Sequence, residues 1–191
     1  MAIEDRRRRE RMARRRLITA TARTLAETEG WEAVTSRRLS TEIEYSQPVL
    51  YQHFGSMEDI VEAVALEGFA ELAETLRAAR LDGTGPGDEL SRVADAYYGF
   101  AARSPALFDA MFTRFSRLDF NAEGTPAPLA GSFGELREAV ATVVGPRDVV
   151  TLTEVVWAAL HGLVVLSRDG RLRPERAAGR LELLVAQVRG G

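Results

Sequence analysis

Apolar residues recur at helical spacing through most of the chain, and no stretch shows the strict alternation of a half-buried strand. Ile18, Ala22 and Leu25 form the first such stripe, and the helix that carries them is predicted to end at Gly30. Glycine- and proline-rich breaks such as "DGTGPGD", which follows Leu81, separate further helical segments. The pattern therefore predicts an all-α protein.

The composition narrows the class of protein. The chain has 191 residues, of which 46% are hydrophobic and 28% charged. This is typical of a globular protein with a buried core, and the length suits a small module joined to a larger body. Cysteine is absent, which excludes a disulfide framework and a thiolate metal site. The longest apolar run, "VVWAALHGLVVL", is shorter than a bilayer span and is interrupted by His161 and Gly162, so we expect a cytoplasmic protein with no membrane contact.

The segment "TSRRLSTEIEYSQPVLYQHF", which runs from Thr35 to Phe54, places many polar side chains around a few apolar ones. In its first half, Thr35 or Ser36 can cap a short helix. Leu39 and Ile43 lie four residues apart in this helix and so share its buried face. The first half of the segment is therefore predicted to be a short amphipathic helix.

The second half of the segment predicts another short helix, capped by Ser46 and with Pro48 in its first turn, where a missing N–H costs nothing. Leu50 and Phe54 are its inward-facing pair. The residues on its outer faces are polar or aromatic, with one valine: Gln47, Val49, Tyr51, Gln52 and His53. A short helix that displays such groups beside a basic arm is built like a helix that reads the major groove of DNA.

The exposed groups suit specific contacts with double-stranded DNA. Gln47 can donate to and accept from an adenine edge, and Val49 can touch a thymine methyl group. Arg37 can reach a guanine or a phosphate. Hydroxyl groups, an imidazole and the N–H groups of a helix N-terminus suit phosphates. Phosphates are therefore the expected partners of four further residues: Thr35, Ser36, Tyr51 and His53.

The first sixteen residues carry eight arginines against three acidic residues, although the formal net charge of the whole chain is -3. All 25 basic residues of the chain are arginines. From the charge pattern alone, the stretch "RRRRERMARRR" is either a solvated tail or an arm that binds DNA phosphates, and both interpretations stay open.

The sequence "VTSRRLSTEIEYSQPVLYQHFGSMEDIVEAV" resembles the helix-turn-helix of TetR-family transcriptional regulators. In that family a short recognition helix carries Leu-Tyr-x-His-Phe and is followed by a capped helix, which here starts at Ser56 with Asp59 completing the capping box. The resemblance implies DNA contacts by six residues: Arg37, Gln47, Pro48, Val49, Tyr51 and His53.

This chain departs from the family pattern at two positions. Met57 stands where the family commonly has a lysine, which puts one phosphate contact in doubt. Glu44 stands in the turn where the family commonly has a glycine. A left-handed backbone at Glu44 is expected to cost about 1–2 kcal/mol.

Later breaks in the sequence predict further helices over residues 89–103, 105–115, 133–144, 148–166 and 174–188. In the fourth of these, Trp157 and His161 lie four residues apart and so share a face. The stretch "WAALHG" that contains them resembles the Trp-His-Gly (WHG) signature of one group of TetR-family C-terminal domains. The resemblance thus extends to the rest of the chain.

Aromatic residues are concentrated in two of these helices, where they form either core or the walls of a small-molecule pocket. His161 is either a hydrogen-bonded structural histidine or a ligand contact. The apolar character of the set predicts a mainly hydrophobic effector. The expected effector-binding residues are Tyr97, Phe100, Met111, Phe112, Phe115, Trp157 and His161.

Two domains are expected: an arm and three-helix helix-turn-helix module over residues 1–56, and a larger helical bundle over residues 57–191. The last two helices are apolar around much of their circumference, which predicts a homodimer interface, as in the family. Leu184, on a stripe with Leu181 and Val188, is the expected centre of that interface.

The leading hypothesis is a ligand-responsive, homodimeric repressor that an effector releases from a pseudo-palindromic DNA operator. No catalytic residue, cofactor or metal site is expected, because the sequence has no nucleophile elbow, phosphate loop or metal-ligand cluster. Two alternatives stay open. One is a small hydrolase that uses His53 or His161, and the other is a helical adaptor with a degenerate DNA-binding module.

Overall fold

The computed structural model describes residues 2–82, 88–114, 124–145 and 147–190. All regular structure within these residues is helical, so the prediction of an all-α protein is confirmed. The chain divides into two compact units. One comprises Met1–Gly68 and Ser104–Asp119, and the other comprises Phe69–Arg103 and Phe120–Gly191.

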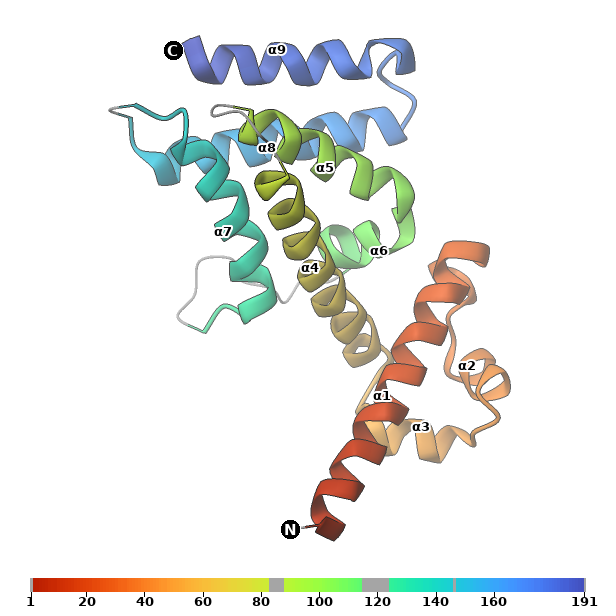
Figure 1. The fold of residues 1–191 in the computed structure, drawn as a ribbon. Helices are drawn as coiled ribbons and strands as arrows, with labels where there is room; N and C mark the ends of the chain where they lie inside the picture. Colours follow the sequence, from red (N-terminus) through yellow and green to blue (C-terminus); the bar gives the residue numbers. More distant parts are fainter. Residues whose placement is uncertain (1, 83–87, 115–123, 146, 191) are drawn as a thin grey trace. The chain divides into compact units, whose positions relative to one another are not determined.

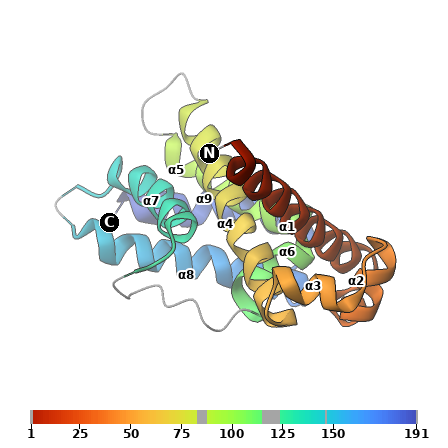
Figure 2. The same ribbon diagram turned by 90° about the horizontal axis from the view of Figure 1, so that it is seen from below.

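The first unit contains the predicted helix-turn-helix. Figures 1 and 2 show α2 and α3 beside α1, which is the longest helix of this unit. The elements are α1 (Ala2–Glu29), the 3-10 turn η1 (Trp31–Ala33), α2 (Ser36–Glu42), α3 (Gln47–His53), the first half of α4 (Met57–Leu81), α6 (Pro105–Asp109) and the π-helical turn η2 (Ala110–Arg114).

The core of this unit is built from the predicted apolar stripes. Ile18 and Ala22 of α1 are fully buried, and so are Leu39 of α2 and Leu50 of α3. Phe54, which caps the C-terminus of α3, is 2% exposed. Because each short helix buries two apolar residues four positions apart, its remaining faces are left to solvent.

The sequence did not predict that α6 belongs with the DNA-binding module. The indole N–H of Trp31 donates to the carbonyl of Ala106 at 2.8 Å in a buried hydrogen bond. Gly68 of α4 lies so close to α6 and η2 that a methyl group there would sit 2.7 Å from the sulfur of Met111. The compact unit therefore extends to Gly68 and takes in α6, whereas the predicted boundary falls between residues 56 and 57.

The second unit is a bundle of the remaining helices. It contains the second half of α4, α5 (Glu89–Arg103), α7 (Ala127–Ala141), α8 (Val149–Arg168), η3 (Pro174–Arg176) and α9 (Ala177–Gly190). α5 contacts α7, α8 and α9, and Figure 1 shows α9 running along α8 and α5. Fully buried residues of the bundle include Leu90, Val93, Val140 and Leu160.

α7 starts earlier than the sequence pattern predicted, at Ala127 instead of residue 133. The stretch "TPAPLAG" contains two prolines and a glycine and so has the composition of a loop. In the structure Pro126 is the N-cap and Pro128 lies in the first helical turn, where a proline removes no helical hydrogen bond. The next residue, Leu129, is buried.

α8 begins at the N-cap Asp148, whose carboxylate accepts from the hydroxyl of Thr151 at 2.7 Å and from the N–H of Val150 at 3.0 Å. These hydrogen bonds lower the pKa of Asp148. Within the described residues α8 is the one helix whose length and composition would allow it to cross a membrane. Only 22% of its apolar stretch is buried in the bundle, so α8 presents a large apolar surface outward.

Candidate nucleic-acid interface

The start of α2 is shaped to receive an anion. Thr35 is the N-cap, and its hydroxyl accepts from the backbone N–H of Arg38 at 3.1 Å. Thr35 and Arg37 are exposed and Ser36 is half-buried. The exposed N-terminal turn of α2 thus combines hydroxyl groups and a guanidinium with the positive end of the helix dipole.

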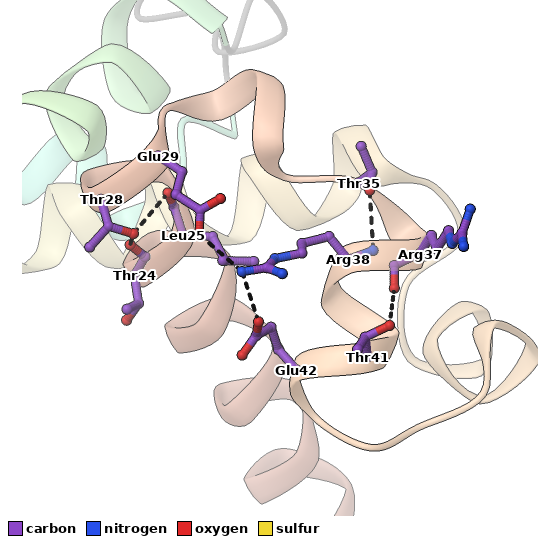
Figure 3. A network of polar contacts seen from close by, with 9 residues as sticks. All are labelled: Thr24, Leu25, Thr28, Glu29, Thr35, Arg37, Arg38, Thr41 and Glu42. Atoms are coloured by element: carbon purple, nitrogen blue, oxygen red, sulfur yellow. Dashed lines mark hydrogen bonds and ion pairs between the residues drawn. The ribbon is translucent and has the colours of Figure 1, made fainter.

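Two adjacent arginines of α2, Arg37 and Arg38, make different contacts, as Figure 3 shows. The guanidinium of Arg38 lies 3.0 Å from a carboxylate oxygen of Glu29 and 3.0 Å from one of Glu42, and so fastens α2 to the end of α1. Arg37 extends away from this network, and only its backbone carbonyl takes part in it, accepting from Thr41 at 3.0 Å. Arg37 is therefore the arginine of α2 whose guanidinium is exposed and takes no part in this network.

The turn between α2 and α3 holds a strained residue. Glu44 has a φ of 56°, in the left-handed region that glycine adopts without cost. The N–H of Tyr45 donates to the carbonyl of Ser40 at 2.9 Å and closes the turn. The turn therefore has the shape that the family pattern implied, although a residue with a Cβ occupies the position.

α3 displays most of the predicted reading residues. Ser46 is its N-cap residue, as predicted, but the Ser46 side chain makes no capping hydrogen bond. The Ser46 carbonyl instead accepts from the N–H groups of Val49 and Leu50. Tyr51 is 43% exposed. The other predicted reading residues divide by burial into exposed Gln47, Pro48 and Gln52 and half-buried Val49 and His53.

His53 closes the C-terminal end of α3. Burial lowers the pKa of its imidazole, and the nearby guanidinium groups of Arg14, Arg11 and Arg15 lower it further. The imidazole is therefore neutral near pH 7. Its Nδ1 atom is buried and has no hydrogen-bond partner within the described part of the chain. A contact of His53 with a phosphate would have to use the Nε2 side of the ring.

The arginine-rich segment is helical and forms the first turns of α1, which begins at Ala2. Arg7, Arg11 and Arg14 are exposed and precede the buried Ile18 at spacings of four, three and four residues. They therefore lie on the helix face that, further along α1, packs on the rest of the module. The N-terminal part of α1 is thus a basic helical arm, and Arg11 and Arg14 on this arm lie near His53 at the C-terminal end of α3.

The predicted effector residues fall in both units. In the bundle, the hydroxyl of the buried Tyr97 accepts from the indole N–H of Trp157 at 3.3 Å and lies 3.3 Å from Nδ1 of His161. Burial raises the pKa of Tyr97 and lowers that of His161. The Tyr97 hydroxyl is therefore protonated and can donate to a neutral His161. Phe100 is buried in the core of the same bundle.

The remaining predicted effector residues belong to the first unit. Met111 is buried against Gly68, and the rings of Phe112 and Phe108 are in contact in a tilted arrangement, with their centroids 4.6 Å apart and their planes at 47°. Phe115 lies outside the described residues. The six of the seven predicted residues that the structure describes are therefore divided between two units, because the sequence does not show which unit receives α6.

The bundle contains a cavity of about 600 Å³ between α7 and α8. Trp157 is the predicted effector residue that lines it, and the ring of Phe133 meets the Trp157 ring edge to face at 6.4 Å. Arg137 and Glu154 supply charged groups. The other lining residues are Thr125, Leu129, Ala130, Gly134, Val150 and Ala158. The sequence prediction did not include Phe133, because this residue lies outside both the two helices in which aromatic residues are concentrated and the "WAALHG" stretch.

Comparison with known proteins assigns both parts of the chain. A family model described as "Bacterial regulatory proteins, tetR family" matches residues 18–64, and one described as "Tetracyclin repressor-like, C-terminal domain" matches residues 90–188. The chain belongs to the TetR family of transcriptional regulators. The predictions of a TetR-family DNA-binding regulator and of a protein that is not an enzyme are thereby confirmed.

One curated protein is similar to this chain in sequence, and two solved structures share its fold. An uncharacterized HTH-type transcriptional regulator of Mycobacterium tuberculosis, Rv0681, is 27% identical over 161 residues, which are 82% of this chain and 71% of the relative. PfmR from Thermus thermophilus shares the fold with a TM-score of 0.66 and 23% identity over 91% of this chain and 97% of its own. BioQ, solved with its double-stranded DNA operator, has a TM-score of 0.66 and 21% identity over 93% and 98% of the two chains.

Proposed function

We propose that this TetR-family regulator is a homodimeric repressor that a small, mainly apolar effector releases from a pseudo-palindromic operator. The observation that carries the proposal is the exposed polar face of α3 above the buried Leu50, beside a basic helical arm. As a regulator of transcription, it would act in the cytoplasm, where the bacterial chromosome lies. The fold that it shares with BioQ, whose solved complex contains an operator duplex, supports the DNA-binding role.

The proposed DNA contacts divide into two kinds. Gln47 and Val49 would reach base edges in the major groove and specify sequence. The exposed N-terminal turn of α2 and the outer side of α3 would hold phosphates and fix the register. The residues of this second group that can donate to a phosphate are Thr35, Ser36, Arg37, Tyr51, Gln52 and His53, whereas Pro48 has no donor and would make only an apolar contact with the DNA. Two α3 helices related by a dimer axis would read half-sites about 34–36 Å apart or a multiple of that distance.

We place the dimer interface on the outward faces of α8 and α9. Val155 of α8 is 56% exposed and Leu183 of α9 is 60% exposed, which is unusual for large apolar side chains unless another surface covers them. The stripe expected from the sequence is wrong, because Leu181 and Val188 are buried within their own bundle. The interface residue of α9 would therefore be Leu183, one position before Leu184.

We assign the effector to the cavity between α7 and α8. Its volume of about 600 Å³ lies within the range of small-molecule sites. Its aromatic walls, Phe133 and Trp157, suit a flat apolar molecule, and Arg137 and Glu154 can orient a polar group on it. Effector binding must change the position of α3 to release DNA. The helix α4 would transmit this change, because it is continuous from one unit into the other. By linkage, DNA and effector would weaken each other's binding by the same factor.

Selection of bound duplexes from a pool of random DNA tests this function. The proposal predicts enrichment of one inverted repeat, together with a sedimentation coefficient that corresponds to a dimer on that duplex. A pool that remains random after several rounds of selection, at low and at moderate salt, would contradict a sequence-specific repressor.

A further inference from the structure

One arginine of the N-terminal segment is placed differently from its neighbours. Arg15 is half-buried, whereas Arg11, Arg14 and Arg16 are exposed. Its guanidinium donates to the backbone carbonyl of His53 and lies over the ring of Phe54, with the central carbon 3.9 Å from the ring centroid. The guanidinium is thus held by two groups from the C-terminal end of α3.

Both contacts are of a kind that fixes a helix end. His53 is the last residue of α3, so its carbonyl lies at the negative end of the helix dipole, where a cation is stabilising. Phe54 is 2% exposed, and a cation over a buried aromatic ring gains more than one over an exposed ring. A planar guanidinium can stack and donate at the same time, which a lysine ammonium cannot match.

Acidic groups favour the same position for the guanidinium. Arg15, His53 and Phe54 line a small cavity of about 260 Å³ together with Asp59 and Glu62 of α4. The carboxylates of Asp59 and Glu62 add negative charge to this cavity, which favours a cation in it. Arg15 therefore ties α1 to α3 on the side where α4 begins.

We propose that Arg15 is a positioning residue for DNA reading: it fixes the C-terminal end of α3 against α1 and does not itself bind DNA. This inference rests on the proposed function of α3 as the reading helix. A tilt of α3 after the loss of this anchor would move Gln47 and Val49 relative to the base edges, and their alignment with the bases would be lost. Nonspecific attraction to phosphates would remain, because the exposed arginines of α1 supply it.

The test compares Arg15→Met with the matched control Arg14→Met, since both remove one guanidinium from neighbouring positions of α1. Binding to a selected operator and to an unrelated duplex is measured over a range of salt concentrations. For Arg15→Met we expect operator affinity to fall about tenfold, unrelated binding to change less than about twofold, and the salt slope to stay unchanged. For Arg14→Met we expect both affinities to fall and the slope of log affinity against log salt to become shallower by about 0.9 for each protomer, or about 1.8 for the dimer.

Two results would overturn the proposal. A shallower salt slope and equal losses on both duplexes would make Arg15 a phosphate contact. A lower melting temperature with an unchanged preference for the operator would show that Arg15 stabilises the fold but does not position α3 for DNA reading. If Arg15→Met does not fold, Arg15→Lys decides, because it keeps the charge and loses the stacked plane: a reduced operator preference supports the proposal and an unchanged one overturns it.

Gln47→Ala, measured in the same experiment, separates this proposal from the function on which it rests. If Gln47→Ala reduces operator preference and Arg15→Met does not, only the role of Arg15 is wrong. If neither variant changes the preference, α3 is not the reading helix, and both proposals fail.

Discussion

The carboxylate of Glu27 in α1 accepts hydrogen bonds from the backbone N–H groups of Leu107, at 3.0 Å, and of Ala106, at 3.1 Å. These N–H groups belong to the first turn of α6, where they have no partner within the helix. A side chain of α1 thus caps α6 from a distance of about eighty residues in the sequence. This contact explains why α6 folds as part of the DNA-binding module.

We predict that Glu27→Gln lowers the free energy of unfolding by about 1–2 kcal/mol, because a neutral amide accepts more weakly at a helix N-terminus. Denaturant unfolding followed by circular dichroism measures the change. Glu32→Gln is the control, since the ion pair of Glu32 with Arg114 lies at the surface and contributes less than about 1 kcal/mol. Equal losses in the two variants would show that the cap on α6 is not a principal contact.

Glu44→Gly is predicted to stabilise the protein by about 1 kcal/mol, because glycine adopts the left-handed backbone without the Cβ clash present at Glu44. The larger backbone entropy of glycine in the unfolded chain offsets part of the gain. Glu44→Ala keeps the Cβ and should give no gain of this size. A destabilised glycine variant would mean that the Glu44 side chain makes a compensating contact.

The helix-turn-helix could be predicted from the sequence because its signals are local. Leu50 and Phe54 are four residues apart and so mark the buried face of α3, and Pro48 marks its first turn. These signals all lie within the helix that they predict. The position of α6 could not be predicted in this way. It depends on Glu27 and Trp31, which meet Ala106 only in three dimensions.

Which face of α9 points outward could not be predicted from the sequence either. Leu181, Leu183 and Leu184 are equally apolar in the sequence, and a period of 3.6 does not tell which face packs on the bundle. In the structure α9 contacts α5 and α8, and Leu181 is buried while Leu183 is exposed. For a similar reason the predicted aromatic pocket combined residues of two separate cores.

We predict that Leu183→Arg converts the protein to a monomer, because an unpaired charge buried in an apolar interface costs several kcal/mol. Analytical ultracentrifugation measures the change, and tight binding to a two-half-site operator should be lost with the dimer. Leu184→Arg is the comparison: Leu184 is half-buried in its own bundle, so this change should lower the melting temperature first. A Leu183→Arg variant that still sediments as a dimer would place the interface elsewhere.

The cavity between α7 and α8 can be tested with an apolar fluorescent probe such as anilinonaphthalene sulfonate. Phe133→Ala removes one aromatic wall and is predicted to weaken probe binding to the native protein several-fold. Phe112→Ala serves as the control, because the Phe112 ring contacts the Phe108 ring in the other unit. It should leave probe binding unchanged and lower the free energy of unfolding by about 1–3 kcal/mol. Equal probe binding in wild type and Phe133→Ala would exclude this cavity as the site of the probe.

The measurement that tests the central claim most directly is the base preference of Gln47→Ala on an operator selected with the wild-type protein. Affinity is measured for the operator and for duplexes in which each base pair of a half-site is changed in turn. The account predicts a loss of about 1–3 kcal/mol on the operator and a relaxed preference at one base pair of each half-site, with folding and dimerisation intact. An unchanged base preference, or an equal loss of affinity for operator and unrelated DNA, would contradict the claim that α3 reads the operator through Gln47.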